Sequence, residues 1–133
     1  MRPDRLPRWG RMSAHQMICH LSDAIRMMTG EKSVRVTTDP LRRTVVKWIA
    51  LYVPLPWPRG IPTSPEIDQL KGGTKPVAFT SDLAQLEALV TAVPTSGRRL
   101  DGHAHPIFGS MSEAAWLRWA YLHLNHHLRQ FGV

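Results

Sequence analysis

The chain has 133 residues, 43% of them hydrophobic and 20% charged, which is the size and composition of one folded domain and excludes a disordered chain. We therefore expect a single domain over residues 1–133. The formal net charge of +7 attracts anions, but the basic residues are scattered and no recognition motif accompanies them, which argues against nucleic-acid binding.

The first predicted helix begins at Ser13, because Gln16 follows at the spacing of a capping box. It runs through "AHQMICHLSDAIRMM" to Gly30, a natural C-terminal cap. The stretch before it, "MRPDRLPRWGRM", carries charge without an apolar run and is not a secretory signal. The helix contains the single cysteine, Cys19, which excludes an internal disulfide and favours a reducing compartment. These features predict a cytoplasmic protein.

The second predicted helix begins at Asp39, a cap, with Pro40 at the first helical position, and it ends before Pro54. It contains the most apolar run of the chain, "VVKWIALYV", which Lys47 interrupts. This run is far shorter than the roughly 20 residues that span a bilayer, so no membrane span is expected. A helix lying in the membrane interface is an alternative, since Trp48 lies close to basic residues, but packing in a bundle fits the pattern better.

A long segment rich in proline and glycine follows, "PLPWPRGIPTSPEIDQLKGGTKPVAF", with one short helical turn expected around "SPEIDQL". Connections of this length usually serve as lids or binding loops, and Trp57 is the tryptophan best placed to line a pocket. The third helix is predicted from Ser81 to Pro94 and the fourth from about Ser112 to Gln130. No strand pattern of useful length occurs. The sequence therefore predicts an all-α fold, a four-helix bundle with long crossover loops.

The fourth helix carries three histidines within "HLNHHLRQ". At 100° per residue, its expected core face is an apolar stripe of Leu117, Leu124, Leu128 and Phe131. His123 and His127 lie beside that stripe, on a face shared with Trp116, Trp119 and Gln130. Residues four apart on a helix have Cβ atoms about 5–6 Å apart, so both imidazoles can bind one metal at about 2.0–2.1 Å. His126 lies at the margin of this face and is the weaker candidate.

A metal needs at least one further protein ligand, and the first helix offers His20. This residue lies at the edge of an apolar sector formed by Met17, Ile18, Leu21, Ala24, Ile25 and Met28. The alternative is a half-buried histidine that only forms hydrogen bonds. His15 falls on the opposite side and is expected in solvent. Cys19 points away from His20, so a metal shared by these two residues is not expected.

The stretches "WGRMSAHQMICHLSDA" and "HPIFGSMSEAAWLRWAYLHLNHHLRQFGV" resemble the DinB/YfiT-like superfamily, and the "LPWPRG" loop matches as well, whereas the middle helices match weakly. The resemblance implies a four-helix bundle, often paired as a homodimer, with a divalent metal, commonly zinc or nickel, held by three histidines. Carried over to this chain, these ligands are His20, His123 and His127. Helical periodicity selects the same three residues.

Three more residues are candidates for catalysis. Gln130 faces the histidine stripe and can hydrogen-bond a ligand or a metal-bound water, or only cap the helix end. Asp23 can orient an imidazole or be an ordinary surface acid. His105 precedes Pro106, which favours an extended backbone. The resemblance places His105 near the mouth of the bundle, where it can contact substrate or supply a fourth ligand, although a loop histidine is more often neither.

Three neutral imidazoles leave a zinc-like ion an open position, where a water reaches a pKa of about 7 or a thiolate or carbonyl oxygen binds. We therefore expect a metal-dependent enzyme that catalyses hydrolysis or thiol S-transfer on a small molecule, and the resemblance suggests a low-molecular-weight thiol. The "HExxH" motif, which includes a general base, is absent. The alternatives are a non-catalytic ligand-binding or stress-related interaction protein on the same bundle and, from the charge alone, a nucleic-acid binder.

Overall fold

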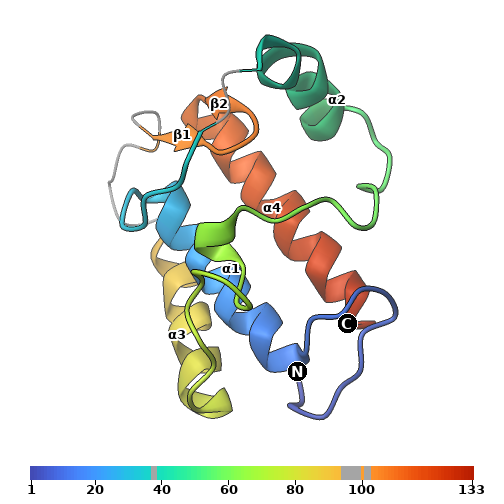
Figure 1. The fold of residues 1–133 in the computed structure, drawn as a ribbon, viewed down its shortest axis with the longest axis vertical. Helices are drawn as coiled ribbons and strands as arrows, with labels where there is room; N and C mark the ends of the chain where they lie inside the picture. Colours follow the sequence, from blue (N-terminus) through green and yellow to red (C-terminus); the bar gives the residue numbers. More distant parts are fainter. Residues whose placement is uncertain (37–38, 94–99, 101–102) are drawn as a thin grey trace.

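The computed structural model describes residues 1–36, 39–93, 100 and 103–133. This part of the chain is mostly helical, as expected, and contains the helices α1 (Ala14–Met28), α2 (Lys47–Tyr52), α3 (Phe79–Ala92) and α4 (Glu113–Gln130) (Figure 1). A π-helical turn, Arg42–Val46, leads into α2, and a 3-10 turn, Pro65–Ile67, follows later. The strands β1 (Ala104–His105) and β2 (Gly109–Ser110) pair antiparallel. Sequence patterns missed this hairpin because two-residue strands are too short to show an alternation.

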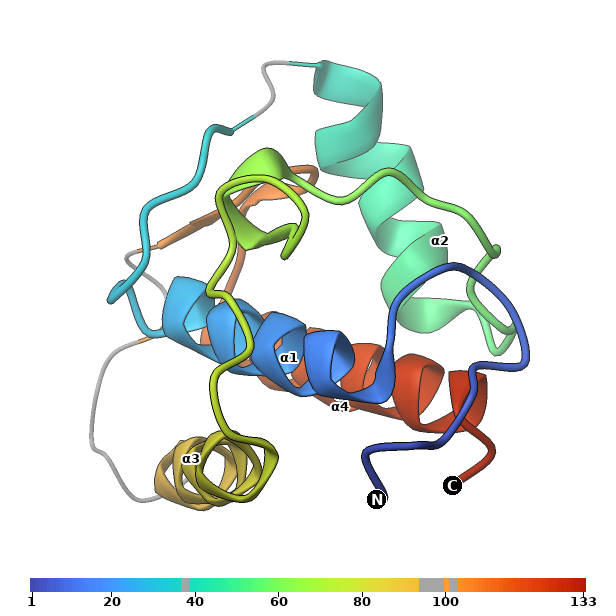
Figure 2. The same cartoon turned by 60° about the horizontal axis from the view of Figure 1, so that its bottom comes forward.

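Helices α1 and α4 lie side by side and run antiparallel, so that the start of α1 lies beside the end of α4 (Figures 1 and 2). Helix α3 packs along α1, and α2 contacts α4. The segment between α2 and α3 crosses over from α2 towards α1 (Figure 2). This arrangement makes α1 the central helix of the molecule.

The N-terminal cap of α1 is the predicted one. The Ser13 hydroxyl accepts from the backbone N–H of Gln16 at 3.1 Å, and Gln16 Oε1 accepts from the backbone N–H of Ser13 at 2.9 Å. The predicted apolar sector of α1 is too narrow, however. Cys19, expected outside it, is 2% exposed, and Asp23 is fully buried. The helical wheel judged each residue by its own polarity, whereas neighbouring segments cover α1 on several sides.

The helical segment that leads into α2 begins as predicted, at Pro40, since Asp39 Oδ1 accepts from the backbone N–H of Leu41 at 2.9 Å. The start of α3 differs from the prediction, because this helix begins at Phe79 instead of Ser81. The Ser81 hydroxyl donates to the Ala78 carbonyl at 3.2 Å and does not cap the helix.

Helix α2 buries a single residue, Leu51. Leu51 is 1% exposed and reaches the core, but Trp48 and Tyr52 are 60% and 49% exposed. Of the apolar run that was expected to pack, Leu51 is therefore buried and its aromatic neighbours are largely exposed. None of the helices in the described part of the chain is long and apolar enough to cross a bilayer.

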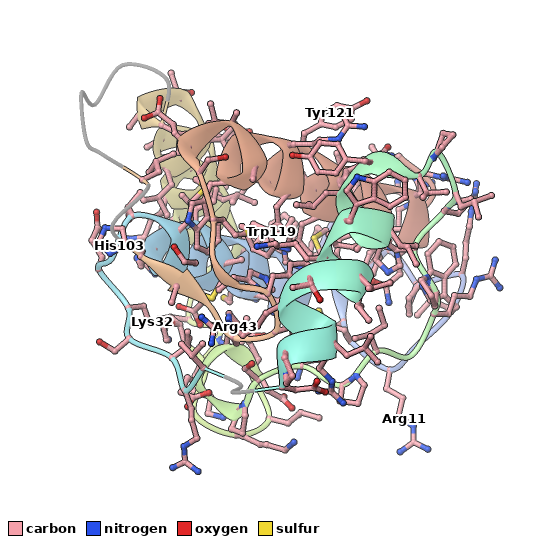
Figure 3. All side chains as sticks on the ribbon, turned by 90° about the horizontal axis from the view of Figure 1, so that it is seen from above. Arg11, Lys32, Arg43, His103, Trp119 and Tyr121 are labelled. Carbon is pink, nitrogen blue, oxygen red and sulfur yellow. The ribbon has the colours of Figure 1, made fainter. Side chains whose placement is uncertain are left out.

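Only part of the predicted core face of α4 is buried. Phe131 is 1% exposed and Leu124 packs against the core, as expected. Leu117 and Leu128, also expected in the core, are 40% and 38% exposed, whereas Trp116 and Trp119 are 0% and 4% exposed. Figure 3 shows Trp119 in the interior and Tyr121, which is 67% exposed, at the outer surface. The stripe that carries the histidines is therefore the face that packs inward.

The N-terminal segment holds the end of α4 in place. The backbone N–H of Arg8 donates to the Gln130 carbonyl at 2.7 Å, and the Arg5 guanidinium donates to the Gly132 carbonyl at 2.7 Å. Gly132, at φ +69°, and Val133 donate back into the last turn as in a Schellman motif. These bonds satisfy carbonyls that a helix end leaves free, and so fix the turn that carries Gln130.

Candidate metal centre

His20 of α1 meets His123 and His127 of α4 where the two helices face each other. The Nε2 atom of His123 lies 3.2 Å from that of His20 and 3.2 Å from that of His127. All three nitrogens lie within 4.8 Å of one another. Nitrogen ligands on a tetrahedral zinc ion are spaced by about 3.3 Å when each Zn–N distance is 2.0–2.1 Å. The three predicted residues are thus grouped at metal-ligand spacing.

The other ring nitrogens fix which atoms face the centre of this group. His20 Nδ1 donates to the Ile67 carbonyl at 2.8 Å, and His127 Nδ1 donates to Gln130 Oε1 at 2.8 Å. Gln130 is oriented in turn, because its Nε2 donates to the Trp9 carbonyl at 2.8 Å. With their N–H groups engaged in this way, His20 and His127 both turn an Nε2 lone pair towards His123.

These orientations suit a cation at the centre of the group. An N–H at His123 Nε2 can point to the lone pair of His20 or to that of His127, but not to both. At least one of the two Nε2–Nε2 contacts of 3.2 Å therefore has no hydrogen between its nitrogens. Protonation does not resolve this conflict. Burial lowers the pKa of His20, lowers that of His123 well below its ordinary value, and lowers that of His127 to about 3. A divalent ion requires the neutral imidazoles that burial favours, so the residues fit a metal.

The histidines line a cavity of about 1310 Å³, whose wall also includes parts of the N-terminal segment, α2, the segment before α3 and the β1–β2 hairpin. Trp57 lines this cavity as predicted, with its ring centroid 6.1 Å from that of His123. Trp119 stacks on His123 from another side, with centroids 4.7 Å apart. The three-histidine group therefore lies in a cavity wall that is rich in aromatic surface.

Of the other predicted residues, Gln130 belongs to this arrangement through its hydrogen bond to His127. His126 lies outside the group of three, and its ring packs at 5.8 Å from that of Trp9. Asp23 is not a surface acid, because it is fully buried. Its carboxylate accepts hydrogen bonds from Gln69 and Thr74 of the segment before α3, and the structure shows none between it and an imidazole.

His105 is 3% exposed and lines the cavity, outside the group of three. Its Nδ1 accepts from the backbone N–H groups of Ile107 and Phe108 at 3.1 and 3.2 Å, and its ring stacks on Phe108. The neutral ring therefore carries its proton on Nε2. That nitrogen can donate a hydrogen bond but cannot accept a proton.

The buried His105 predicts a loss of stability in acid. Burial lowers the pKa of His105 to about 3, whereas an unfolded histidine has a pKa of about 6.5. Below pH 6.5 the unfolded state binds this proton first, so stability falls as the pH falls. The side-chain oxygen of His105→Asn can accept from the same N–H groups. Between pH 6.5 and pH 4 we expect the free energy of unfolding of this variant to fall by about 3 kcal/mol less than that of the wild type. Denaturant unfolding at several pH values measures this, and parallel pH profiles would contradict it.

His15 was expected in solvent, but the structure shows it partly buried. Its side chain is 22% exposed, and its Nε2 lies 2.7 Å from Asp82 Oδ2 of α3. Cys19, on the same helix, lies close to the same carboxylate, and burial raises the pKa of its thiol to about 11. The wheel could not place these side chains because α3 covers this side of α1.

Sequence reasoning missed two groups of the site, the carbonyls of Ile67 and Trp9, which orient His20 and Gln130. No side-chain pattern signals them, since every residue has a carbonyl.

A family model described as "Protein of unknown function (DUF1569)" matches residues 6–132. No curated protein and no solved structure matches the chain. The matched range contains all three histidines and both helices that carry them.

Proposed function

Since the chain belongs to the DUF1569 family of proteins of unknown function, we propose its function from the site itself. The protein is a metal-dependent enzyme in which His20, His123 and His127 hold a divalent ion, zinc or nickel, and its fold is a DinB/YfiT-like four-helix bundle with long crossover loops. The observation that carries the proposal is the convergence of three Nε2 atoms, at 3.2 Å from one to the next, beside a large cavity.

The number of ligands favours catalysis over a structural role. Structural zinc sites are closed by four protein ligands, whereas catalytic sites keep three and an open position. When bound, such an ion lowers the pKa of a coordinated water to about 7 or accepts a thiolate or carbonyl oxygen. Hydrolysis or thiol S-transfer on a small molecule, such as a low-molecular-weight thiol, follows from this chemistry.

The three other candidates take different roles in this proposal. Gln130 orients His127. His105, with its proton on Nε2, donates a hydrogen bond to substrate in the cavity. Asp23 anchors the segment before α3, including the turn whose Ile67 carbonyl orients His20. Trp57 and Trp119 supply apolar surface beside His123 on which a small molecule packs.

Metal content together with turnover tests the proposal. We expect the purified protein to contain zinc or nickel, and to catalyse at least one reaction in a panel of ester, amide and thiol-transfer substrates. This turnover should vanish with a chelator and return when the metal is restored. Bound metal without turnover would identify a ligand-binding protein on the same fold, and failure to bind any divalent metal would refute the proposal.

Replacing Gln130 tests how strongly the supporting hydrogen bonds matter. In Gln130→Ala the His127 ring loses its Nδ1 partner and its fixed orientation, so we expect the metal affinity of the three-histidine site to fall about 10–100-fold. Gln130→Glu keeps an acceptor for the Nδ1 proton and should bind much more tightly than the alanine variant. Competition with a chromophoric chelator measures both affinities. Equal affinities for wild type and Gln130→Ala would show that Gln130 only closes the helix end.

The proposal includes a homodimer, which the resemblance implies. Exposed aromatic residues of α2 and α4, among them Trp48, Tyr52 and Tyr121, offer apolar surface for such pairing. Light scattering should then give twice the 15.1 kDa mass of one chain. A measured mass equal to that of a single chain would contradict the proposed homodimer.

A further inference from the structure

A second group of metal-binding side chains lies where α1 packs against α3. His15 and Cys19, four residues apart on α1, face Asp82 in the first turn of α3. Asp82 Oδ2 is 2.7 Å from His15 Nε2 and 3.8 Å from Cys19 Sγ. One ligand atom from each residue lies within 4.8 Å of the other two. The group combines an imidazole, a thiol and a carboxylate.

These separations are close to those of a zinc site. With bonds of about 2.0–2.3 Å to nitrogen, oxygen and sulfur, neighbouring ligand atoms of a tetrahedral zinc ion are about 3.3–3.7 Å apart. The distance between Asp82 and Cys19 already fits, and the distance between Asp82 and His15 must widen by less than about 1 Å. We propose that His15, Cys19 and Asp82 form a second divalent-metal site, which ties α3 to α1.

The surroundings of Asp82 support this assignment. Its Oδ2 also accepts from the Val77 backbone N–H at 3.0 Å, which fixes the carboxylate towards α1. The edge of the His15 ring packs against Phe79, with centroids 5.4 Å apart. Cys19 is 2% exposed, whereas the side chains of His15 and Asp82 are 22% and 17% exposed. The group is therefore held in position, and solvent at its edge can supply a fourth ligand.

The chemistry of this group differs from that of the three histidines. A thiolate and a carboxylate together neutralise a divalent ion, so the loaded site carries no net charge between the two helices. Thiolate ligands favour zinc over the harder divalent ions magnesium and calcium. Cys19 immediately precedes His20 in the chain, yet the two side chains belong to separate groups. A metal at one group does not require a metal at the other.

Cobalt(II) is the probe that separates the two sites, because only a thiolate gives sulfur-to-cobalt charge transfer in the near ultraviolet. Cys19 is the only cysteine of the chain. We expect the full-length protein, titrated under anaerobic conditions, to bind two equivalents of cobalt, with the charge-transfer band growing for one of them. Binding of a single equivalent without this band would overturn the second site and leave the three-histidine site intact.

Four variants complete the experiment. Cys19→Ser should bind one equivalent without the band, whereas His123→Ala should retain the band and lose the other equivalent. His15→Ala and Asp82→Asn should each weaken the thiolate equivalent at least tenfold, and these partly exposed positions serve if Cys19→Ser does not fold. A band unchanged in both His15→Ala and Asp82→Asn would show that Cys19 binds cobalt with other partners, and would refute the proposed ligands. Loss of the band in His123→Ala would refute the independence of the two sites.

Discussion

Replacing His123 by alanine is expected to lower the metal affinity of the three-histidine site about a hundredfold and to abolish any turnover that a chelator suppresses. His123 is the central member of the group, since its Nε2 lies 3.2 Å from the Nε2 of both other histidines. Zinc held by four protein ligands binds with an apparent free energy of about 10–16 kcal/mol, or about 2.5–4 kcal/mol per ligand. Each 1.4 kcal/mol corresponds to a tenfold change in affinity.

His126→Ala is the matched control for this experiment. His126 lies on the same turn of α4 and is also partly buried, but it lies outside the group of three. We expect this variant to bind metal like the wild type. In both variants the quantity to measure is the binding of the cobalt equivalent that gives no sulfur-to-cobalt charge-transfer band, because that equivalent reports the three-histidine site. If His123→Ala keeps that equivalent at wild-type affinity, or His126→Ala loses it, the assignment of ligands is wrong.

The second large effect is expected at Asp23, which is fully buried at the centre of α1. Its Oδ1 accepts from Thr74 Oγ1 at 2.7 Å and lies 2.9 Å from Lys32 Nζ, and its Oδ2 accepts from Thr74 N and Gln69 Nε2. Removing one member of a buried ion pair leaves the other charge without compensation and costs about 3–5 kcal/mol. Asp23→Ala should therefore remove much of the 5–15 kcal/mol by which a domain of this size is usually stable.

Denaturant unfolding measures this loss, with Asp4→Ala as control. Asp4 forms an exposed ion pair with Arg2 at 3.5 Å, and substitutions of this kind change stability by about 0.5 kcal/mol or less. Asp23→Asn keeps the shape and one acceptor oxygen, so its stability should lie between those of wild type and Asp23→Ala. A cost below about 1 kcal/mol for Asp23→Ala would show that the buried ion pair contributes little.

The Asp23 substitution also bears on the site. Gln69 and Thr74 belong to the segment that carries the Ile67 carbonyl, the hydrogen-bond partner of His20. If Asp23→Ala remains folded at low temperature, we expect weaker metal binding than in wild type, because His20 is then less firmly oriented. Asp23 would act here through His20 and not by contact with the metal.

Features governed by residues a few positions apart were predictable. The caps at Ser13 and Asp39 depend on backbone N–H groups two or three residues away, and both were identified correctly. The pairing of His123 with His127 follows from the helical repeat, which places residues four apart on one face. The start of α3 was missed because Ser81 resembles a cap in sequence, although its hydroxyl donates to the Ala78 carbonyl.

Burial was less predictable, because it depends on what covers a helix. Cys19 and His15 were expected outside the core of α1, and a surface position was one of two readings for Asp23, yet α3 and the segment before it cover all three. On α4 the leucines appeared to be the core face, but the inward face is the one with Trp116 and Trp119. A helical wheel gives the angle between two side chains and does not show which neighbouring segment lies at each angle.

By itself the sequence determined the presence of the helices, the caps at Ser13 and Asp39, and the three histidines that share suitable faces, because these depend on local hydrogen bonds and on the helical repeat. Only the tertiary structure decided that the imidazoles of α1 and α4 converge, that the Ile67 and Trp9 carbonyls orient the site, and that α3 brings Asp82 to His15 and Cys19. These contacts join segments far apart in the chain. Their geometry depends on how whole helices pack, which no local pattern encodes.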